Sequence, residues 1–275
     1  MITTPNHLHA PQAKIALEHS CHVLVEKPFT LSSQDATELV ALANAQRKQL
    51  CVYQNRRFDG DFLTLAALIK EGTLGDIKRL DSRFDRFRPV PRNRWRENAG
   101  PGSGIFWDLG PHLIDQALQL FGQPEAVSAN ILTLREGGQS DDTFDITLHY
   151  TDKMIKLGSS AFQAGTTLRY DLQGTKGSFR KFHLDPQENQ LRAGLPFDDA
   201  SWATSEPTQD GVLALVNESG DVVEQTIPTQ KGEYLTFFTR LAHAIEHAER
   251  SPADASTVIP VIRVMELAIK ASETG

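Results

Sequence analysis

Cysteine is scarce in this sequence, which has only Cys21 and Cys51 among its 275 residues. The chain contains neither a CxxC pair nor a cysteine–histidine cluster, which argues against a structural zinc site. A disulfide framework is not expected either, because two cysteines far apart in the chain are a poor basis for one. Sparse cysteine usage suits a reducing compartment, so we expect a cytoplasmic protein.

Long apolar runs and positive charge are also missing. No stretch approaches the roughly 20 apolar residues of a membrane span, and the N-terminal MITTPNHLHAPQ has neither the basic nor the apolar region of a signal peptide. The net charge of -7 argues against general binding to nucleic acids or anionic membranes. The hydrophobic share of 40% is ordinary for a soluble globular protein, and the length allows two domains.

The first part of the chain alternates helices and strands. Hydrophobic periodicity and capping residues predict helices at 11–20, 32–48 and 61–72, and strands at 22–26 and 50–53. Ser32 or Ser33 would cap the second helix, and Gly72 would end the third. This alternation is typical of βαβ units with a parallel sheet, whose ligands bind at the carboxyl ends of the strands.

The rest of the chain predicts a different architecture. After an extended segment at 77–87 and a loop rich in Pro and Gly, a helix is expected at 111–122, with Pro111 as its first residue. Strands at 126–134, 143–150, 154–162, 166–173 and 178–182 would form one open, largely antiparallel sheet. Residues 185–230 are expected to be irregular, and helices at 232–250 and 256–272 would close the chain. The predicted fold class is therefore α/β plus α+β, with a partial Rossmann-like domain at 1–57 and a large-sheet domain at 58–275.

Lys27 is the first candidate for chemistry. The apolar run HVLV ends in Glu26, Lys27 and Pro28, at a predicted strand end where ligands bind in α/β sheets. A lysine there can hydrogen-bond a substrate hydroxyl and stabilise a developing alkoxide. Pro28 fixes the backbone next to it, and such X-Pro bonds are sometimes cis. The alternative is an ordinary surface lysine.

The second candidate is the run GPGSGIFWDLGPHLIDQALQLFG. With Pro111 at the start of the helix, His112 would lie in the first turn and Asp108 in the loop before it. The positive helix end would keep His112 neutral and competent as a general base, with Asp108 orienting the ring or holding a hydroxyl. Alternatively, His112, Asp115, Gln116 and Gln119 belong to the solvated face of an amphipathic helix. A metal site is not expected, because no third ligand is evident.

Two further groups have weaker signals. In TPNHLHAP, either Thr4, Asn6 or His7 caps the following helix, or the segment lies beside a bound dinucleotide. The second group, Asn55, Arg56 and Arg57 with Arg94, Trp95 and Arg96, would line a polyol or phosphate pocket, or would form an ordinary solvated surface.

Taken together, these motifs resemble the Gfo/Idh/MocA family of NAD(P)-dependent oxidoreductases. The resemblance rests on TPNHLHAP, EKP, the pattern D-x-G-x-H-x-x-D and the closing SPADASTVIPVIRVMELAIKAS. In the third of these the matching residues are Asp108, Gly110, His112 and Asp115. It covers essentially the whole chain and is strongest to the bacterial scyllo-inositol dehydrogenase branch, through QNRRFDGDFLTL and FDRFRP…RWRE…GPGSG.

The resemblance implies hydride transfer between NAD or NADP and a hydroxyl or carbonyl of a polyol or sugar. Lys27 would polarise the hydroxyl, His112 would take its proton, and Asp108 would hold the substrate. The residues implied in cofactor binding are Thr4, Pro5, Asn6, His9, Glu26, Lys27, Asn55, Arg57, Trp95 and Arg96. A dimer or tetramer through the open face of the large sheet is also implied.

The sequence departs from this family in one respect. Family members begin with a strand and a glycine-rich G-x-G-x-x-[GA] turn that binds the pyrophosphate, and about 70 such residues have no counterpart here. Three explanations are open: a fragment or misplaced start, completion by a partner chain or by swapping, or loss of catalysis. In the last case the protein would be an oligomerising or sugar-binding remnant.

Overall fold

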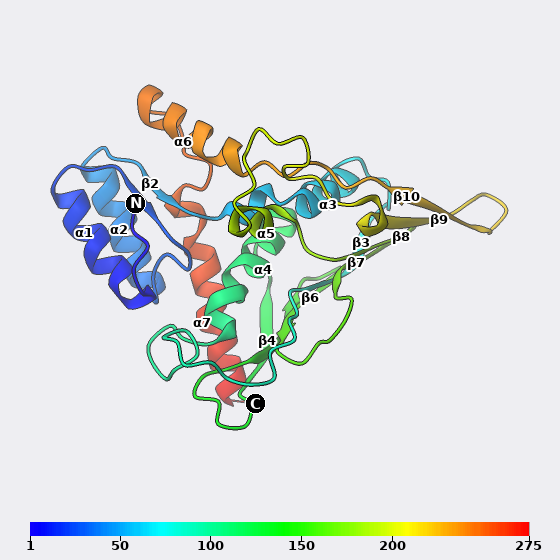
Figure 1. Cartoon of the computed structure of the whole chain (residues 1–275), viewed down its shortest axis with the longest axis horizontal. Coiled ribbons are helices and arrows are strands. Elements are labelled where there is room, and N and C mark those ends of the chain that lie inside the picture. The colour runs from blue at the N-terminus through cyan, green and yellow to red at the C-terminus, as the bar shows by residue number, and fades with distance from the viewer. Residues whose placement is uncertain (275) are drawn as a thin grey trace.

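A computed structural model describes residues 1–274 as two packed units (Figure 1). The smaller unit contains the 3₁₀ helix η1 (Asn6–Leu8), α1 (His9–Glu18), β1 (Val23–Val25), α2 (Ser33–Ala45) and β2 (Leu50–Val52). Strands β1 and β2 pair in parallel, and Ile2 adds a parallel bridge to Val25. The predicted βαβ arrangement is thus confirmed.

Local signals explain the ends of these helices. The Ser32 hydroxyl accepts the Asp35 amide at 3.0 Å, so the predicted N-cap of α2 is confirmed. Helix α1 begins earlier than expected, because η1 leads into it without a break. No side chain caps η1 or α1, so the capping explanation for Thr4, Asn6 and His7 is wrong.

The larger unit is built on an eight-stranded sheet with the order β10-β9-β8-β7-β3-β6-β5-β4. Every pair is antiparallel except β3–β6, which confirms the largely antiparallel sheet. Its elements are η2 (Asn55–Phe58), α3 (Gly60–Lys70), β3 (Ile77–Arg83), α4 (Ile105–Phe121), β4 (Ala126–Leu132), β5 (Thr143–His149), β6 (Met154–Ser160), β7 (Leu168–Gly174), β8 (Gly177–Phe182), α5 (Gln187–Arg192), η3 (Pro207–Gln209), β9 (Gly211–Val216), β10 (Val222–Ile227), α6 (Tyr234–His247), η4 (Ala255–Thr257) and α7 (Ile259–Thr274).

One face of the sheet carries the core. Phe144, Ile146 and Leu148 of β5 are buried, while the residues between them face the other side. Helices α4 and α7 pack on the covered face, and α7 also contacts α2 of the small unit (Figure 1). Such packing would contribute roughly 1.5–3 kcal/mol for each large apolar side chain that is fully buried.

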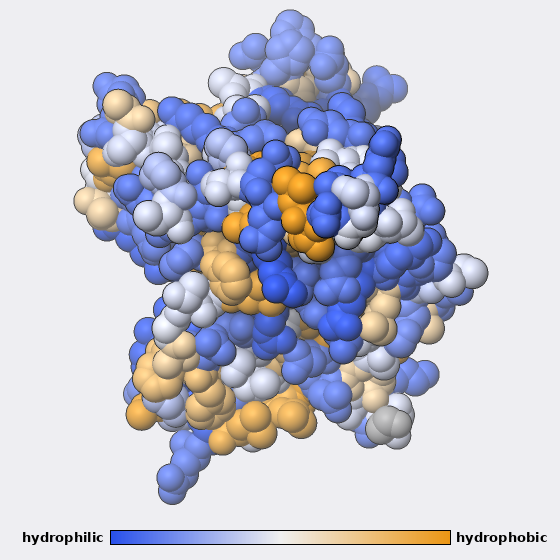
Figure 2. Space-filling model, turned by 90° about the vertical axis from the view of Figure 1, so that its right-hand side faces the viewer, coloured by the Kyte–Doolittle hydropathy of each residue, from blue (hydrophilic) through white to orange (hydrophobic). Residues whose placement is uncertain are grey.

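The opposite face of the sheet is charged. Arg79 pairs with Asp81, Arg83 pairs with Asp145, and the face forms a broad hollow of about 790 Å³. On the side of the molecule where β9 and β10 lie, hydrophobic patches are set within a mostly hydrophilic surface (Figure 2).

Two predicted elements were wrong. Residues 185–230 include α5 and the β9–β10 hairpin. The hairpin escaped detection because most of β10 is exposed and polar residues interrupt its apolar pattern.

Helix α4 begins at Ile105, not at Pro111, which lies inside the helix. Its first turn is capped from a distance, since the Asp141 carbonyl accepts the Ile105 amide at 2.9 Å and the Asp141 carboxylate accepts the Phe106 amide at 2.6 Å. No local pattern could reveal that cap.

Candidate active site

Lys27 links the small unit to helix α4. It follows β1, and its peptide bond to Pro28 is cis. The Lys27 ammonium donates to the Asp108 carboxylate at 2.8 Å and also to the Asp108 backbone carbonyl. The strand end and the first turn of α4 therefore meet at this ion pair.

Asp108 is held in its charged form by the cations around it. Burial alone would raise its pKa, but Lys27, Arg96 and Arg86 outweigh that effect and hold the pKa well below its usual range. The Arg96 Nε lies 3.9 Å from the same carboxylate oxygen that binds Lys27. The carboxylate is an acceptor at any pH at which the protein would work.

His112 lies one helical turn after Asp108, on the same face of α4. Its side chain is buried, and within residues 1–274 its Nδ1 has no hydrogen-bond partner. Burial lowers the pKa of His112 well below its usual value, and the nearby charges of Lys27 and Arg56 lower it further. The expectation of a neutral ring is met, but the proposed cause was wrong, because His112 lies beyond the first turn of α4.

The TPNHLHAP segment packs beside Lys27, Asp108 and His112. The His9 Nε2 lies 2.9 Å from the Thr4 carbonyl, and His9 Nδ1 is buried without a partner among the described residues. Burial lowers the pKa of His9, and Lys27 and Arg96 lower it further. Pro5 precedes η1.

Asn6 ties this segment to the GPGSG loop. Its side-chain amide donates to the Gly102 carbonyl at 2.8 Å. Gly102 has a positive φ of 72°, and a Cβ there would lie within 2.6 Å of the Leu31 side chain. The glycine lets the loop approach the small unit closely and brings the start of α4 near Lys27.

The ends of β1 and β2 present two further polar side chains. Burial raises the pKa of Glu26, although Lys27 opposes that shift. Gln54 follows β2, is almost completely buried, and has no partner for its side-chain Nε2 or Oε1 within residues 1–274. We predicted that ligands bind at these strand ends, but we did not name Gln54 as a site residue.

Arg57 and Asp115 do not face an open pocket. The Arg57 guanidinium binds the Asp115 carboxylate through two bonds of 2.6 and 2.8 Å, so the pair fastens η2 to α4. Gln116 is buried and donates to the Arg56 carbonyl at 2.8 Å. The solvated-face explanation is therefore wrong for His112, Asp115 and Gln116 and holds only for Gln119, which is exposed. Asn55 lies at the start of η2 and forms no side-chain hydrogen bond to the described residues.

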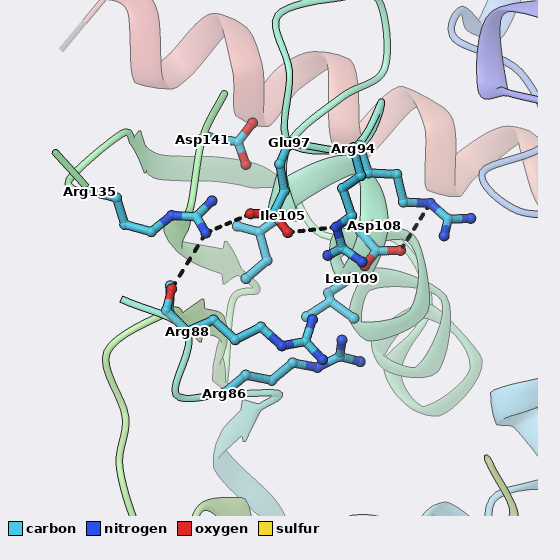
Figure 3. Close-up of a pocket in the computed structure, with 12 residues that line it drawn as sticks. Arg86, Arg88, Arg94, Glu97, Ile105, Asp108, Leu109, Arg135 and Asp141 are labelled. Carbon is cyan, nitrogen blue, oxygen red and sulfur yellow. Dashed lines mark hydrogen bonds and ion pairs between the residues drawn. The ribbon is translucent and has the colours of Figure 1, made fainter. Parts of the chain in front are cut away.

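Arginines surround a cavity at the start of α4 (Figure 3). The cavity has a volume of about 30 Å³, and Asp108 lines it, whereas Lys27 and His112 do not. Arg86 and Arg88 line it and also line an adjoining cavity of about 320 Å³. The motif FDRFRP contains both, but the arginines that we predicted as functional were Arg56, Arg57, Arg94 and Arg96. Trp95 is 39% exposed, with the Arg96 guanidinium 4.8 Å from its ring centre.

The described part of the chain holds neither a cluster of potential metal ligands nor a helix that could span a membrane. Residues 1–274 contain no group of three or more potential metal ligands from His, Cys, Asp and Glu. None of their helices is both long and apolar enough to cross a bilayer.

Two family models match the chain. Residues 66–275 match the C-terminal alpha/beta domain of an oxidoreductase family, and residues 1–54 match the NAD-binding Rossmann fold of the same family.

Similar proteins agree with these matches. The uncharacterized oxidoreductase YdgJ of Escherichia coli is 42% identical, with 99% of this chain and 78% of that protein covered. The scyllo-inositol 2-dehydrogenase (NADP(+)) IolW of Bacillus subtilis is 38% identical, with 99% of this chain and 76% of that protein covered. The solved structure of the oxidoreductase yvaA from Bacillus subtilis matches with a TM-score of 0.95 and 38% identity, covering 99% of this chain and 77% of that one.

Proposed function

The chain belongs to the Gfo/Idh/MocA family of NAD(P)-dependent oxidoreductases, and on that basis we propose that it oxidises or reduces a polyol or sugar. Hydride would pass between NAD or NADP and a carbon that carries a hydroxyl or carbonyl. The observation that carries this proposal is the Lys27–Asp108 ion pair beside the neutral, buried His112. The scyllo-inositol dehydrogenase among its relatives supports a polyol-like substrate.

Lys27 is suited to bind the reacting oxygen. A lysine ammonium has three N–H donors, and Asp108 accepts two of them through its carboxylate and its carbonyl. The third remains for a substrate hydroxyl or carbonyl oxygen. Asp108 fixes the direction of the ammonium, and the positive charge would stabilise negative charge that develops on that oxygen.

His112 is suited to move the proton. Because its imidazole is neutral, a ring nitrogen can accept the hydroxyl proton during oxidation. The lowered pKa means that the ring stays unprotonated below pH 6.5, so oxidation would persist into mildly acidic solution. In the reverse direction, the protonated ring would be a strong acid toward a developing alkoxide.

The residues present fit the nicotinamide end of a dinucleotide. Among residues 1–274, Gln54, which follows β2, and His9, which begins α1, have buried polar atoms without partners. Cofactors of this fold class bind at the carboxyl edge of such strands. Thr4, Pro5, Asn6, Glu26 and Asn55 lie in the segments that follow or adjoin this edge. When bound, nicotinamide supplies the hydride acceptor or donor. The proposal covers both NAD and NADP.

Assembly and location are part of the same proposal. A homodimer or homotetramer would form through the open face of the large sheet, whose charged rows can pair across a symmetry axis. The free thiols of Cys21 and Cys51 are consistent with a cytoplasmic protein.

Cofactor titration tests the proposal. NADH and NADPH would each be added to the purified chain while nicotinamide fluorescence is followed, and turnover would be assayed with scyllo-inositol and a panel of sugars. We expect saturable binding of one cofactor at least. Lys27→Ala should retain that binding and lose about 10²–10³ of turnover, because one donor to the reacting oxygen is removed.

The exposed Lys70→Ala is the matched control and should turn over normally. If the chain is folded and oligomeric but binds neither dinucleotide, that result would contradict the proposed oxidoreductase activity. It would favour the rival reading of a truncated remnant that oligomerises or binds sugars. Full turnover by Lys27→Ala would remove the assigned role of the lysine.

A further inference from the structure

We propose that the substrate of this chain carries an anionic group, a carboxylate or a phosphate, that binds Arg86 and Arg88. This inference rests on the proposed function and narrows its substrate class to sugar acids or sugar phosphates. It departs from the neutral inositol named for one relative.

The two arginines are placed side by side by the backbone. Beyond β3, the Arg86 amide donates to the Ser160 carbonyl at 3.0 Å and the Arg88 amide donates to the Ala161 carbonyl at 2.7 Å. The extended pairing therefore continues, and side chains two residues apart lie on one face. Figure 3 shows both arginines reaching toward α4, near Asp108 and Leu109.

Neither guanidinium is bonded to a carboxylate among residues 1–274, although the Arg86 guanidinium lies 5.0 Å from the ring centre of Phe84. In residues 1–274 the side chains of Arg86 and Arg88 form no hydrogen bond and no ion pair, although both are partly buried. Burial, together with the charges of neighbouring arginines, Arg86 first, lowers the pKa of Arg88 to about 10. Burial also lowers the pKa of Arg86. Asp108 and Glu188 act on Arg86, and Glu97 acts on Arg88, only through space. Partly desolvated like charges that no carboxylate contacts directly are costly, and a bound anion would offset that cost.

The nearby carboxylates are already engaged. Glu97 accepts from Arg94 at 2.6 Å and from Arg135 at 2.8 Å. Asp108 binds Lys27, and the Asp141 carboxylate accepts the Phe106 amide. In the adjoining cavity, Glu188 pairs with Arg56 and Arg192.

Asp185, which also lines the larger cavity, accepts the Gly60 amide at 2.7 Å and the Gln187 amide at 2.9 Å. Among residues 1–274, none of these carboxylates is bonded to Arg86 or Arg88. Two parallel guanidiniums match the planar oxygens of a carboxylate or the oxygens of a phosphate.

The position of the pair suits a substrate. Asp108, which binds Lys27, lines the small cavity together with Arg86 and Arg88. That cavity of about 30 Å³ has room for a head group of a few atoms, and the adjoining cavity of about 320 Å³ has room for a larger body. An anion held there would lie close to the reacting carbon and would help to orient it.

Calorimetry on the chain of 275 residues tests this inference directly. The probes are D-glucose, D-glucuronate and D-glucose 6-phosphate, with inorganic phosphate as a competitor. We expect at least one of the two anionic sugars to bind about 10–100-fold more tightly than glucose. Tighter binding of glucuronate would identify the carboxylate as the preferred group, and tighter binding of glucose 6-phosphate would identify the phosphate.

Variants assign the effect to the arginine pair. Arg86→Gln/Arg88→Gln should remove the advantage of the anionic sugar and leave glucose and NAD(P)H binding unchanged. If the double variant does not fold, Arg88→Gln alone should reduce the advantage. The matched control is Arg263→Gln, which removes the same charge from an exposed position on α7 that lines neither cavity, and it should change nothing.

The outcomes separate the two proposals. Equal affinity for glucose and both anionic sugars would overturn the anion site, while cofactor binding and turnover of a neutral polyol would keep the oxidoreductase. Weaker NAD(P)H binding in the double variant, with sugar binding unchanged, would also overturn the inference. Tight anion binding by a chain that binds neither dinucleotide would support the anion site and contradict the proposed enzyme.

Discussion

Two groups of arginines differ in whether they bind a carboxylate of the protein. Arg57 and Arg169, deep in the molecule, each bind a buried carboxylate, Asp115 in one case and Asp61 in the other. Arg86 and Arg88, at the edge of the cavities near α4, bind none within the described residues. The first group stabilises the fold, and the second is left with charge to offer a ligand.

The Arg169 network shows how completely the first group is satisfied. Its guanidinium binds Asp61 at 2.9 Å, Ser82 at 3.1 Å and Gln116 at 2.7 Å, and stacks 4.2 Å from the ring centre of Tyr170. These contacts join α3, β3, α4 and β7. An arginine that has so many partners has little capacity left for a substrate.

The largest effect is expected from breaking this network. Arg169→Leu leaves the Asp61 carboxylate buried without its cation, and we expect a loss of about 3–5 kcal/mol in the free energy of unfolding. Urea denaturation at neutral pH measures it. Arg180→Leu, which removes an exposed arginine paired with Asp171, is the control and should cost less than about 1 kcal/mol. Equal losses in both variants would erase the distinction between buried and exposed pairs.

A smaller loss of stability is expected when two paired arginines lose their carboxylate and so become unpaired, as Arg86 is. Glu97→Gln removes the carboxylate shared by Arg94 and Arg135, at a cost of about 2 kcal/mol at neutral pH. Burial alone would raise the pKa of Glu97, but bonds from the Arg92 amide and three guanidiniums outweigh it and lower the pKa to about 2.

The pH dependence of that loss provides a second check. Because the folded-state pKa of Glu97 is depressed, its stabilising effect is fully present above the unfolded pKa and is lost as the pH falls through about 2. The difference between wild type and Glu97→Gln should therefore shrink as the pH drops below about 4.3. A difference that is constant from pH 7 to pH 3 would contradict the assigned charge.

The smallest change in stability is expected at the unpaired arginines. Arg88→Gln removes one of two neighbouring like charges and breaks no bond within residues 1–274. The free energy of unfolding should stay within about 0.5 kcal/mol of wild type, with any change upward. Thermal unfolding without ligand measures it. A loss above about 1 kcal/mol would show that Arg88 has a structural partner and would remove it from the ligand-binding group.

Much of the fold was accessible to sequence reasoning. The alternation of helices and short apolar strands predicted the parallel β1–β2 pair, and regular strand patterns predicted most of the large sheet. The error at α4 has a cause that is not local. The start of α4 depends on Asp141, and that residue is remote in sequence from the first turn it caps. Helix propensity around Pro111 could not reveal a cap supplied from another segment.

The candidate site shows the same division. Lys27, Asp108 and His112 were identified from strand-end position, the residues around Pro111 and family resemblance. Their convergence in the structure appears as the Lys27–Asp108 bond and as the charge of Lys27 acting on His112. Arg57 was assigned to the cofactor, but it is bonded to Asp115. The sequence could not show which arginines pair with carboxylates, since each is a cation in a polar stretch.

The order of apolar and polar residues was enough to set the periodicity of the strands, the positions of most helices and the strand end that bears Lys27. These depend on neighbours along the chain, whose interactions are short-ranged. Which arginine meets a carboxylate, and which faces a cavity with its charge unmatched, depends on segments brought together from distant positions. Folding decides this, because the energy of a charge is set by the atoms packed around it and not by the residues that precede it.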